Sequence, residues 1–447
     1  MMNLALYLDS GIHQGGWRHP DSAATGGSNW PLYRKIAQRA EDAKLDMIFV
    51  ADKLAIDDVY GGHLAHTVQH RQVGWSEPLT LLAALAAVTD HIGLGGTVSS
   101  SYSVPYTTAR QLANIDHISG GRAAWNVVTS LSHAEARNFG RSEHFSHEAR
   151  YRRAAEFIDV MKALWDSFEE DALILDKAQA HFADPARFHK LDHQGESFNV
   201  QGPLNLPRPP QGHPVVIQAG VSEAFIDLAA QQAEVLFVVQ PNRERAQQFY
   251  QTLKQRALQY QRQPDQLRIL PGMVPIVGNS QRDAEERAAY LKSLITVESG
   301  LSFVSASMNI DLSQYPIDGP VPDLREKITG SKGRFQYVIA SAIEQNLTLG
   351  EMAKRYAESL SFPAPTGTAD SIAQQMIDWY QHQACDGFVI LPTYIDENED
   401  RFLEQVVPRL QAAGVFRSDY QPGTLRDRLG LVKPENRFNR SSSIEIT

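Results

Sequence analysis

The 447-residue sequence contains a single cysteine, Cys385, so no disulfide can form within the chain. It has no apolar run near the roughly 18 residues that a membrane-spanning helix needs, and no basic segment leads into an apolar signal core at its N-terminus. Basic residues are outnumbered by acidic ones, with 42 Lys and Arg against 52 Asp and Glu, and the net charge is −10. Nucleic acids and anionic membranes attract basic patches, so neither is expected as the main partner. We expect a cytoplasmic protein.

Blocks of like charge, low-complexity tracts and short internal repeats are absent as well. With 43% hydrophobic and 21% charged residues, the chain can bury a large core. No linker divides the sequence into independent parts. The sequence therefore predicts one globular domain over residues 1–447.

What the sequence does contain is an alternation of short apolar segments with helical patterns. Eight segments are predicted as strands: Leu4–Leu8, Met47–Ala51, Ile92–Val98, Ala123–Thr129, Val215–Ala219, Val235–Val239, Ile269–Val277 and Gly387–Leu391. Helices are expected at Pro31–Lys44, Glu77–Thr89, Ser146–Trp165, Ser222–Gln232, Arg243–Tyr260 and Ser371–Gln381. Repeated strand–helix units form parallel sheets, and eight of them predict a closed (β/α)₈ TIM barrel.

Such a barrel needs about 250 residues, so roughly 200 must belong to insertions and tails. One insertion is expected after the fourth strand, at about residues 166–213, where prolines and glycines exclude a regular helix. Another is expected after the seventh strand, at about residues 279–383, and a tail at about residues 421–447. The first is expected to wrap the barrel or line a subunit contact, and the second to include a lid.

The segment from Gly120 to Tyr151 carries the strongest local signal. Its strand is apolar and β-branched, as in a parallel strand buried on both faces. A polar stretch follows, and a helical pattern begins only near Ser146. Chemistry in these barrels lies at the carboxyl ends of the strands. Half of an active site is therefore expected here, with Asn126, Thr129, Ser130, His147 and Tyr151.

A second strand passes through glycine into a helix at Gln218-Ala-Gly-Val-Ser222. Free N–H groups and the helix dipole favour an anion at such a site, and the Ser222 hydroxyl adds a donor. The alternative is that Ser222 is only an N-cap. The sequence leaves both interpretations open.

Other chemistries have weaker signals. His63, His66 and His70 are spaced for one helical face, but no HExxH motif or cysteine pair accompanies them, so no metal site is predicted. No G-x-S-x-G elbow occurs, and Gly93-Leu-Gly95-Gly96 lacks dinucleotide-fingerprint spacing. Arg150, Arg152 and Arg153 are interpreted as a solvated helix face.

Seven motifs together resemble one family. They are Gly16-Trp-Arg-His-Pro20, Asp46-Met-Ile-Phe-Val-Ala-Asp52, Asp116-His-Ile-Ser-Gly-Gly-Arg122, Trp125-Asn-Val-Val-Thr-Ser130, Asn138-Phe-Gly140, Gln218-Ala-Gly-Val-Ser222 and Thr424-Leu-Arg-Asp-Arg-Leu-Gly430. The chain resembles the bacterial-luciferase-like flavin monooxygenases over nearly its whole length. Within them it is similar to the branch of nitrilotriacetate monooxygenase component A, pristinamycin synthase A and dibenzothiophene-sulfone monooxygenase.

The resemblance implies a site for FMN. Asp52 and Thr97 match positions beside the isoalloxazine ring. His147, Tyr151 and Ser222 match contacts to the phosphate and ribityl chain, with Ser130 beside them. His13 matches roughly a histidine near the flavin, although a solvent-facing loop histidine is the alternative. Lys332 and Arg334 resemble a basic loop of the aminopolycarboxylate-oxidising members, which we expect to act as a lid over an anionic substrate.

The resemblance also implies the activity. A separate NAD(P)H:FMN reductase supplies reduced FMN (FMNH₂), and O₂ is the co-substrate. A flavin C4a-(hydro)peroxide then oxidises a small organic substrate, such as a carboxylated amine or a sulfur compound. Family members commonly form homodimers or homotetramers. Two alternatives stay open, namely a flavin- or deazaflavin-dependent oxidoreductase that does not activate O₂ and a non-catalytic flavin-binding protein.

Overall fold

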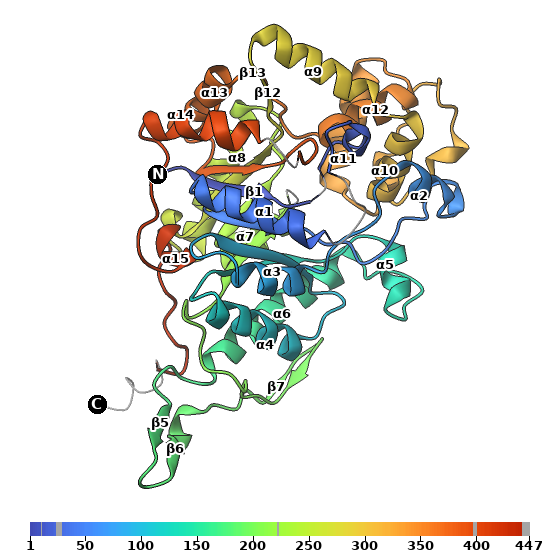
Figure 1. Cartoon of the computed structure of the whole chain (residues 1–447). Coiled ribbons are helices and arrows are strands. Elements are labelled where there is room, and N and C mark those ends of the chain that lie inside the picture. The colour runs from blue at the N-terminus through green and yellow to red at the C-terminus, as the bar shows by residue number, and fades with distance from the viewer. Residues whose placement is uncertain (10, 24–28, 221–222, 397–399, 440–447) are drawn as a thin grey trace.

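The computed structural model describes residues 1–9, 11–23, 29–220, 223–396 and 400–439. Its centre is a closed barrel of parallel strands in the order β1-β14-β11-β10-β9-β4-β3-β2 (Figure 1). These strands are β1 (Asn3–Tyr7), β2 (Met47–Val50), β3 (Gly93–Ser99), β4 (Ala123–Val128), β9 (Val215–Ala219), β10 (Val235–Val238), β11 (Arg268–Met273) and β14 (Gly387–Ile390). The predicted (β/α)₈ barrel is confirmed, with every predicted strand contributing to it.

Alternation along each strand builds two apolar layers. In β1, Leu4 and Leu6 pack with the surrounding helices, whereas Ala5 and Tyr7 belong to the cluster that fills the barrel. The helices of the outer layer are α1 (Trp30–Asp42), α3 (Pro78–Ala86), α4 (Pro105–Ile118), α6 (His147–Asp166), α7 (Glu223–Gln232), α8 (Arg243–Gln259), α13 (Ala369–Gln381) and α14 (Val407–Ala412). Both faces of the strands are therefore buried, which explains their continuous apolar sequence.

The seventh predicted strand is shorter than expected. β11 ends at Met273, and Pro275, which has no N–H to donate, separates it from β12 (Ile276–Gly278). Outside the barrel, β12 pairs in parallel with β13 (Thr366–Thr368). The single strand Ile269–Val277 was therefore a wrong prediction, because the chain leaves the barrel at the proline.

The two insertions lie at different ends of the barrel. The first contains two small hairpins, β5 (Leu173–Asp176) with β6 (His181–Ala183) and β7 (His193–Gln194) with β8 (Asn199–Val200). The β5–β6 hairpin projects away from the barrel (Figure 1). The second insertion supplies α9 (Gln281–Ser293), α10 (Val297–Met308), α11 (Lys332–Glu344) and α12 (Leu349–Ser359). In Figure 1, α10, α11 and α12 form one group with α2 (Ala65–His70), and α5 (His133–Asn138) lies below it.

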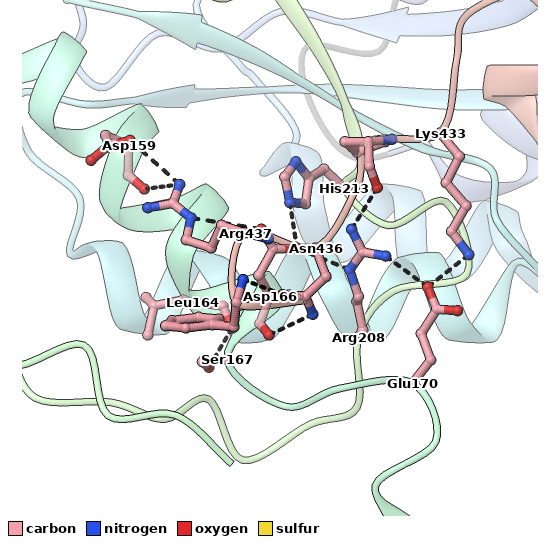
Figure 2. A network of polar contacts seen from close by, with 12 residues as sticks. Asp159, Leu164, Asp166, Ser167, Glu170, Arg208, His213, Lys433, Asn436 and Arg437 are labelled. Carbon is pink, nitrogen blue, oxygen red and sulfur yellow. Dashed lines mark hydrogen bonds and ion pairs between the residues drawn. The ribbon is translucent and has the colours of Figure 1, made fainter. Parts of the chain in front are cut away.

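The C-terminal tail contains α15 (Leu425–Arg428) and is anchored to the first insertion. Figure 2 shows Asp166, at the end of α6, as the centre of that contact. Its Oδ1 accepts hydrogen bonds from Arg208 Nε and His213 Nε2, both at 2.9 Å. Asn436 Nδ2 donates to the Asp166 carbonyl at 2.9 Å. A buried carboxylate with these partners fixes both segments to the barrel. Among the described residues, no helix has both the length and the apolar character needed to cross a membrane.

Candidate active site

A cavity of about 460 Å³ opens at the carboxyl ends of β1, β2, β4, β9 and β10 and is also lined by α10 and the start of α11. Its polar and charged lining residues include Asp52, Lys53, Arg71, Ser130, Glu135, His147, Arg150, Gln218, Lys332 and Arg334. Aromatic residues complete the wall: Tyr7, Trp75, Tyr151, Phe225, Phe237, Phe303 and Phe362. Of the residues expected to form half of an active site here, Thr129, Ser130, His147 and Tyr151 line the cavity, whereas Asn126 does not.

The turn after β4 is held rigidly. Ser130 has a left-handed backbone, with φ of 53°, and its Oγ lies 2.8 Å from that of Ser99 on β3. Glu135 accepts hydrogen bonds from the N–H groups of Leu131 and Ser132, at 3.1 Å each. This capping box starts α5, a short helix that the sequence analysis did not predict. Ser130 is thereby presented to the cavity by backbone geometry.

His147 and Tyr151 project from the first turns of α6, which is N-capped by Ser146 as the sequence pattern indicated. Their ring centroids lie 4.8 Å apart. Burial, together with the charges of Arg150 and Lys332, lowers the pKa of His147. At neutral pH its imidazole is therefore uncharged and can donate or accept one hydrogen bond at each nitrogen.

Arg150 corrects one sequence interpretation. It is 4% exposed, lines the cavity, and donates from NH1 to the Ser130 carbonyl at 2.9 Å. Its neighbour Arg152 is exposed and pairs with Glu196 at 3.3 Å. The solvated helix face was therefore correct for Arg152 and wrong for Arg150, because α6 turns Arg150 inward beside Tyr151.

The two residues matched to the flavin ring differ in position. Asp52 lines the cavity, and burial raises its pKa to about 6 despite a hydrogen bond from the Lys53 N–H at 2.8 Å. Thr97 lies inside β3, where its hydroxyl donates to the Val50 carbonyl and accepts from Asn126 Nδ2, both at 2.9 Å. Thr97 is not among the residues that line the cavity. It joins β2, β3 and β4 next to the site.

His13 is buried at 5% exposure, which excludes the alternative of a solvent-facing loop histidine. It lines a smaller cavity of about 80 Å³ that shares Tyr7, Arg71 and Trp75 with the main one. Its Nδ1 accepts a hydrogen bond from the Gly15 N–H at 3.1 Å, and burial lowers its pKa to about 4. His13 is therefore neutral at pH 7, with its proton on Nε2.

The predicted basic loop is a helix start. Lys332 and Arg334 lie in the first turn of α11, and both line the cavity. Arg334 NH1 donates to the Tyr356 hydroxyl at 3.2 Å. A Cβ at Gly330 would lie 2.2 Å from the Ser307 carbonyl oxygen, so this glycine permits close packing against the end of α10. The expected basic loop is therefore the first turn of a helix at these two residues. Ser222, in the other predicted anion site, lies outside the described residues.

Several lining residues were not predicted from the sequence. Lys53 and Arg71 give no motif, and Gln218 was quoted only as part of a motif. Gln218 is 2% exposed, and its Oε1 has no hydrogen-bond partner among the described residues. A polar residue inside an apolar strand, two positions before Gly220, was the one signal for it. The rings of His63 and His66 stack at 5.3 Å, but no group of three potential ligands in the described chain could hold a metal ion.

Comparison with known proteins identifies the family of the chain. The sequence model of the family described as luciferase-like monooxygenase matches residues 11–386. The chain belongs to this family. N-acetyl-S-(2-succino)cysteine monooxygenase of Bacillus subtilis (strain 168) is 43% identical over 440 residues, 98% of each chain. Dibenzothiophene-sulfone monooxygenase of Rhodococcus erythropolis is 44% identical over 442 residues, 97% of each chain. Nitrilotriacetate monooxygenase component A of Aminobacter aminovorans is 41% identical over 450 residues, 99% of each chain.

Solved structures of luciferase-like proteins share the fold. A crystal structure of riboflavin lyase with modified FMN and riboflavin superposes with a TM-score of 0.87 at 28% identity, covering 97% of this chain and 96% of that one. The predicted resemblance and barrel class are thus confirmed. This luciferase-like monooxygenase is an enzyme whose cavity lies at the carboxyl ends of the barrel strands.

Proposed function

We propose that the chain is the oxygenase component of a two-component monooxygenase that uses reduced FMN and O₂. The observation that carries this proposal is the composition of the cavity. Its lining combines hydroxyl, phenol, imidazole and guanidinium groups with several aromatic rings. A phosphate-bearing tricyclic ligand needs both.

FMN fits the residues present. Arg150, His147 and Tyr151 would hold the phosphate, with Ser130 beside them; Ser222 is kept as a further phosphate contact by the resemblance. The Oε1 atom of Gln218, which lacks a partner among the described residues, can accept from a ribityl hydroxyl or a ring N–H. Asp52 would contact the ring, and Thr97, whose hydroxyl donates to the Val50 carbonyl, would hold the end of β2 that precedes Asp52 in place. When bound, reduced FMN would supply the electrons that activate O₂.

The chain's own residues would exclude water and hold protons. Tyr7, Phe237 and Phe362 line an apolar wall of the cavity. His13, with its pKa near 4, keeps a neutral imidazole whose Nε2–H can donate a hydrogen bond without delivering a charge. It is our candidate for a catalytic hydrogen-bond donor.

A separate NAD(P)H:FMN reductase is proposed as the partner, because the sequence has no dinucleotide fingerprint of its own. The relative named component A supports a multi-component system. A homodimer or homotetramer and a cytoplasmic location stay predictions.

The charge of the cavity favours an anionic substrate. Among its described lining residues, the cations Lys53, Arg71, Arg150, Lys332 and Arg334 outnumber the acids Asp52 and Glu135. FMN phosphate neutralises part of this excess. We therefore propose a carboxylated amine or thioether as the substrate class, in agreement with the names of two relatives, and Arg334 and Lys332 as residues that close over it.

A coupled assay tests the function. The protein, FMN, NADH and a flavin reductase are incubated with nitrilotriacetate, N-acetyl-S-(2-succino)cysteine or dibenzothiophene sulfone, and products are identified by mass spectrometry. We expect an oxygenated or cleaved product only when reductase, FMN and O₂ are all present. Product formation without O₂ would favour the oxidoreductase alternative instead.

A further inference from the structure

A buried ionic triad borders the cavity where the sequence analysis predicted no site residue. Asp57 Oδ2 accepts from Lys53 Nζ at 2.5 Å and from Arg71 NH1 at 2.9 Å. The Asp57 and Arg71 side chains are only 3% and 5% exposed. Although burial opposes it, the charges of Lys53 and Arg71 hold the pKa of Asp57 below its usual value. One carboxylate thus faces two cations, and the triad carries one uncompensated positive charge.

Arg71 has hydrogen-bonding capacity to spare. NH1 is used by Asp57 and lies 3.4 Å from the Ser302 hydroxyl. Its Nε has no hydrogen-bond partner in the part of the chain that the structure describes. The guanidinium carbon lies 4.5 Å from the Phe303 ring centroid, so one face of the group is covered by the ring. Asp57 and Phe303 therefore fix the orientation of Arg71, and its remaining donors lie along the edge of the guanidinium group.

Arg71 borders the cavity in which we propose that the substrate binds. Arg71 lines both the main cavity and the smaller cavity of His13, and Trp75 lies in the wall of both. The residues proposed to hold the FMN phosphate come from a different sector of the barrel mouth, namely the segment after β4 and α6. Lys53 and Arg71 instead follow β2, and β3 lies between β2 and β4 in the barrel, so two cationic groups from different segments of the mouth can bind two anions.

From this arrangement we infer that Arg71 binds an anionic group of the substrate, a carboxylate in the first instance. Lys53 supplies a second cation, and Asp57 is a positioning residue that holds both. A planar guanidinium matches a carboxylate with two parallel hydrogen bonds, and burial strengthens each of them. The inference rests on the proposed function and adds to it a residue that selects charged over uncharged substrates.

The test compares Arg71→Met and Arg71→Lys with a matched control, Arg245→Met. Arg245 is exposed on α8, where its guanidinium lies 4.8 Å from the Tyr337 ring centroid, and it does not line the cavity. Reductase-coupled turnover is measured with N-acetyl-S-(2-succino)cysteine and with its methyl esters. Thermal unfolding and reduced-FMN affinity are measured for each variant, so that a folding or cofactor defect is recognised.

We expect Arg71→Met to raise KM for the acid by about 10- to 100-fold, the usual effect of losing a hydrogen bond to a charged group, with little change for the esters. Arg71→Lys should recover part of that loss because it keeps the charge without the planar fork. Arg245→Met should behave as the parent. Equal effects on acid and esters would overturn the inference, and so would a selective loss of reduced-FMN affinity in Arg71→Met.

A calorimetric titration of the FMN-loaded protein with succinate separates this inference from the proposed function. If succinate binds to the parent and to Arg245→Met but not to Arg71→Met, the anion site stands even when no oxygenated product forms. Equal binding to all three proteins, or no binding to the parent, contradicts the anion site whatever the turnover assay gives.

Discussion

Replacing Arg150 with Met tests the proposed phosphate site most stringently. Arg150 is 4% exposed and borders the cavity beside Tyr151, and its Nε has no partner among the described residues. Hydrogen bonds to charged groups contribute about 1.5–3 kcal/mol each. Since 1.4 kcal/mol is a factor of ten, Arg150→Met should weaken reduced-FMN binding about 10- to 100-fold.

The assay is an anaerobic titration of the protein with reduced FMN and, separately, with reduced riboflavin. Riboflavin lacks the phosphate, so its affinity should change little. Arg152→Met is the control, because Arg152 is exposed, pairs with Glu196 and lies two residues away on the same helix. The Ser130 carbonyl loses its partner in Arg150→Met, so a stability loss of about 1–3 kcal/mol is expected as well. If FMN and riboflavin affinities fall equally in a folded variant, Arg150 does not bind the phosphate and the reasoning fails.

Further predictions concern other parts of the site. Tyr151→Phe should weaken reduced-FMN binding roughly tenfold or more without altering thermal unfolding, and unchanged affinity would remove Tyr151 from the phosphate site. Asp52 has a pKa raised to about 6, so its contribution to stability is greatest near pH 4 and is lost as pH rises through 6. In urea unfolding without flavin, the parent should therefore lose about 1–2 kcal/mol between pH 4 and 7 relative to Asp52→Asn, and parallel pH profiles would contradict the raised pKa. Replacing both Lys332 and Arg334 with alanine should raise KM for the substrate and increase hydrogen peroxide release while leaving FMN affinity unchanged; unaltered KM and peroxide release would contradict their role in closing over the substrate. Without a reductase, the protein should oxidise almost no NADH, and rapid oxidation would contradict the two-component scheme.

The strands of the barrel could be predicted because each is a short apolar run bounded by turn residues. The start of α6 could also be predicted, because Ser146 precedes a regular helical pattern, and in the structure Ser146 caps the helix. The break in the seventh predicted strand could also have been predicted from Pro275. Proline has no N–H for a strand hydrogen bond, and β11 ends two residues before it. At these positions the local sequence determines where an element begins or ends.

The site was harder to predict, because its residues are brought together by tertiary packing. Arg150 and Arg152 look alike in sequence, and only the rotation of α6 against the barrel buries one and exposes the other. Arg71 acquires its place from Asp57 and Phe303, a carboxylate and a ring on separate segments. Lys332 and Arg334 were expected in a loop, but they lie in the first turn of α11, just after Gly330, which packs closely against Ser307. Such contacts leave no periodic pattern in the sequence.

The central claim, a monooxygenase driven by reduced FMN, is tested most directly by tracing oxygen. The protein is supplied with a flavin reductase, NADH, FMN and isotopically labelled O₂, with N-acetyl-S-(2-succino)cysteine and nitrilotriacetate as probes. We predict that one labelled oxygen atom appears in the organic product for each molecule of substrate consumed, with any aldehyde or ketone reduced as it forms so that its oxygen does not exchange with water, and that the label is absent when either FMN or the reductase is omitted. Product whose new oxygen comes from unlabelled water, or substrate oxidation that proceeds in the absence of O₂, would contradict the account.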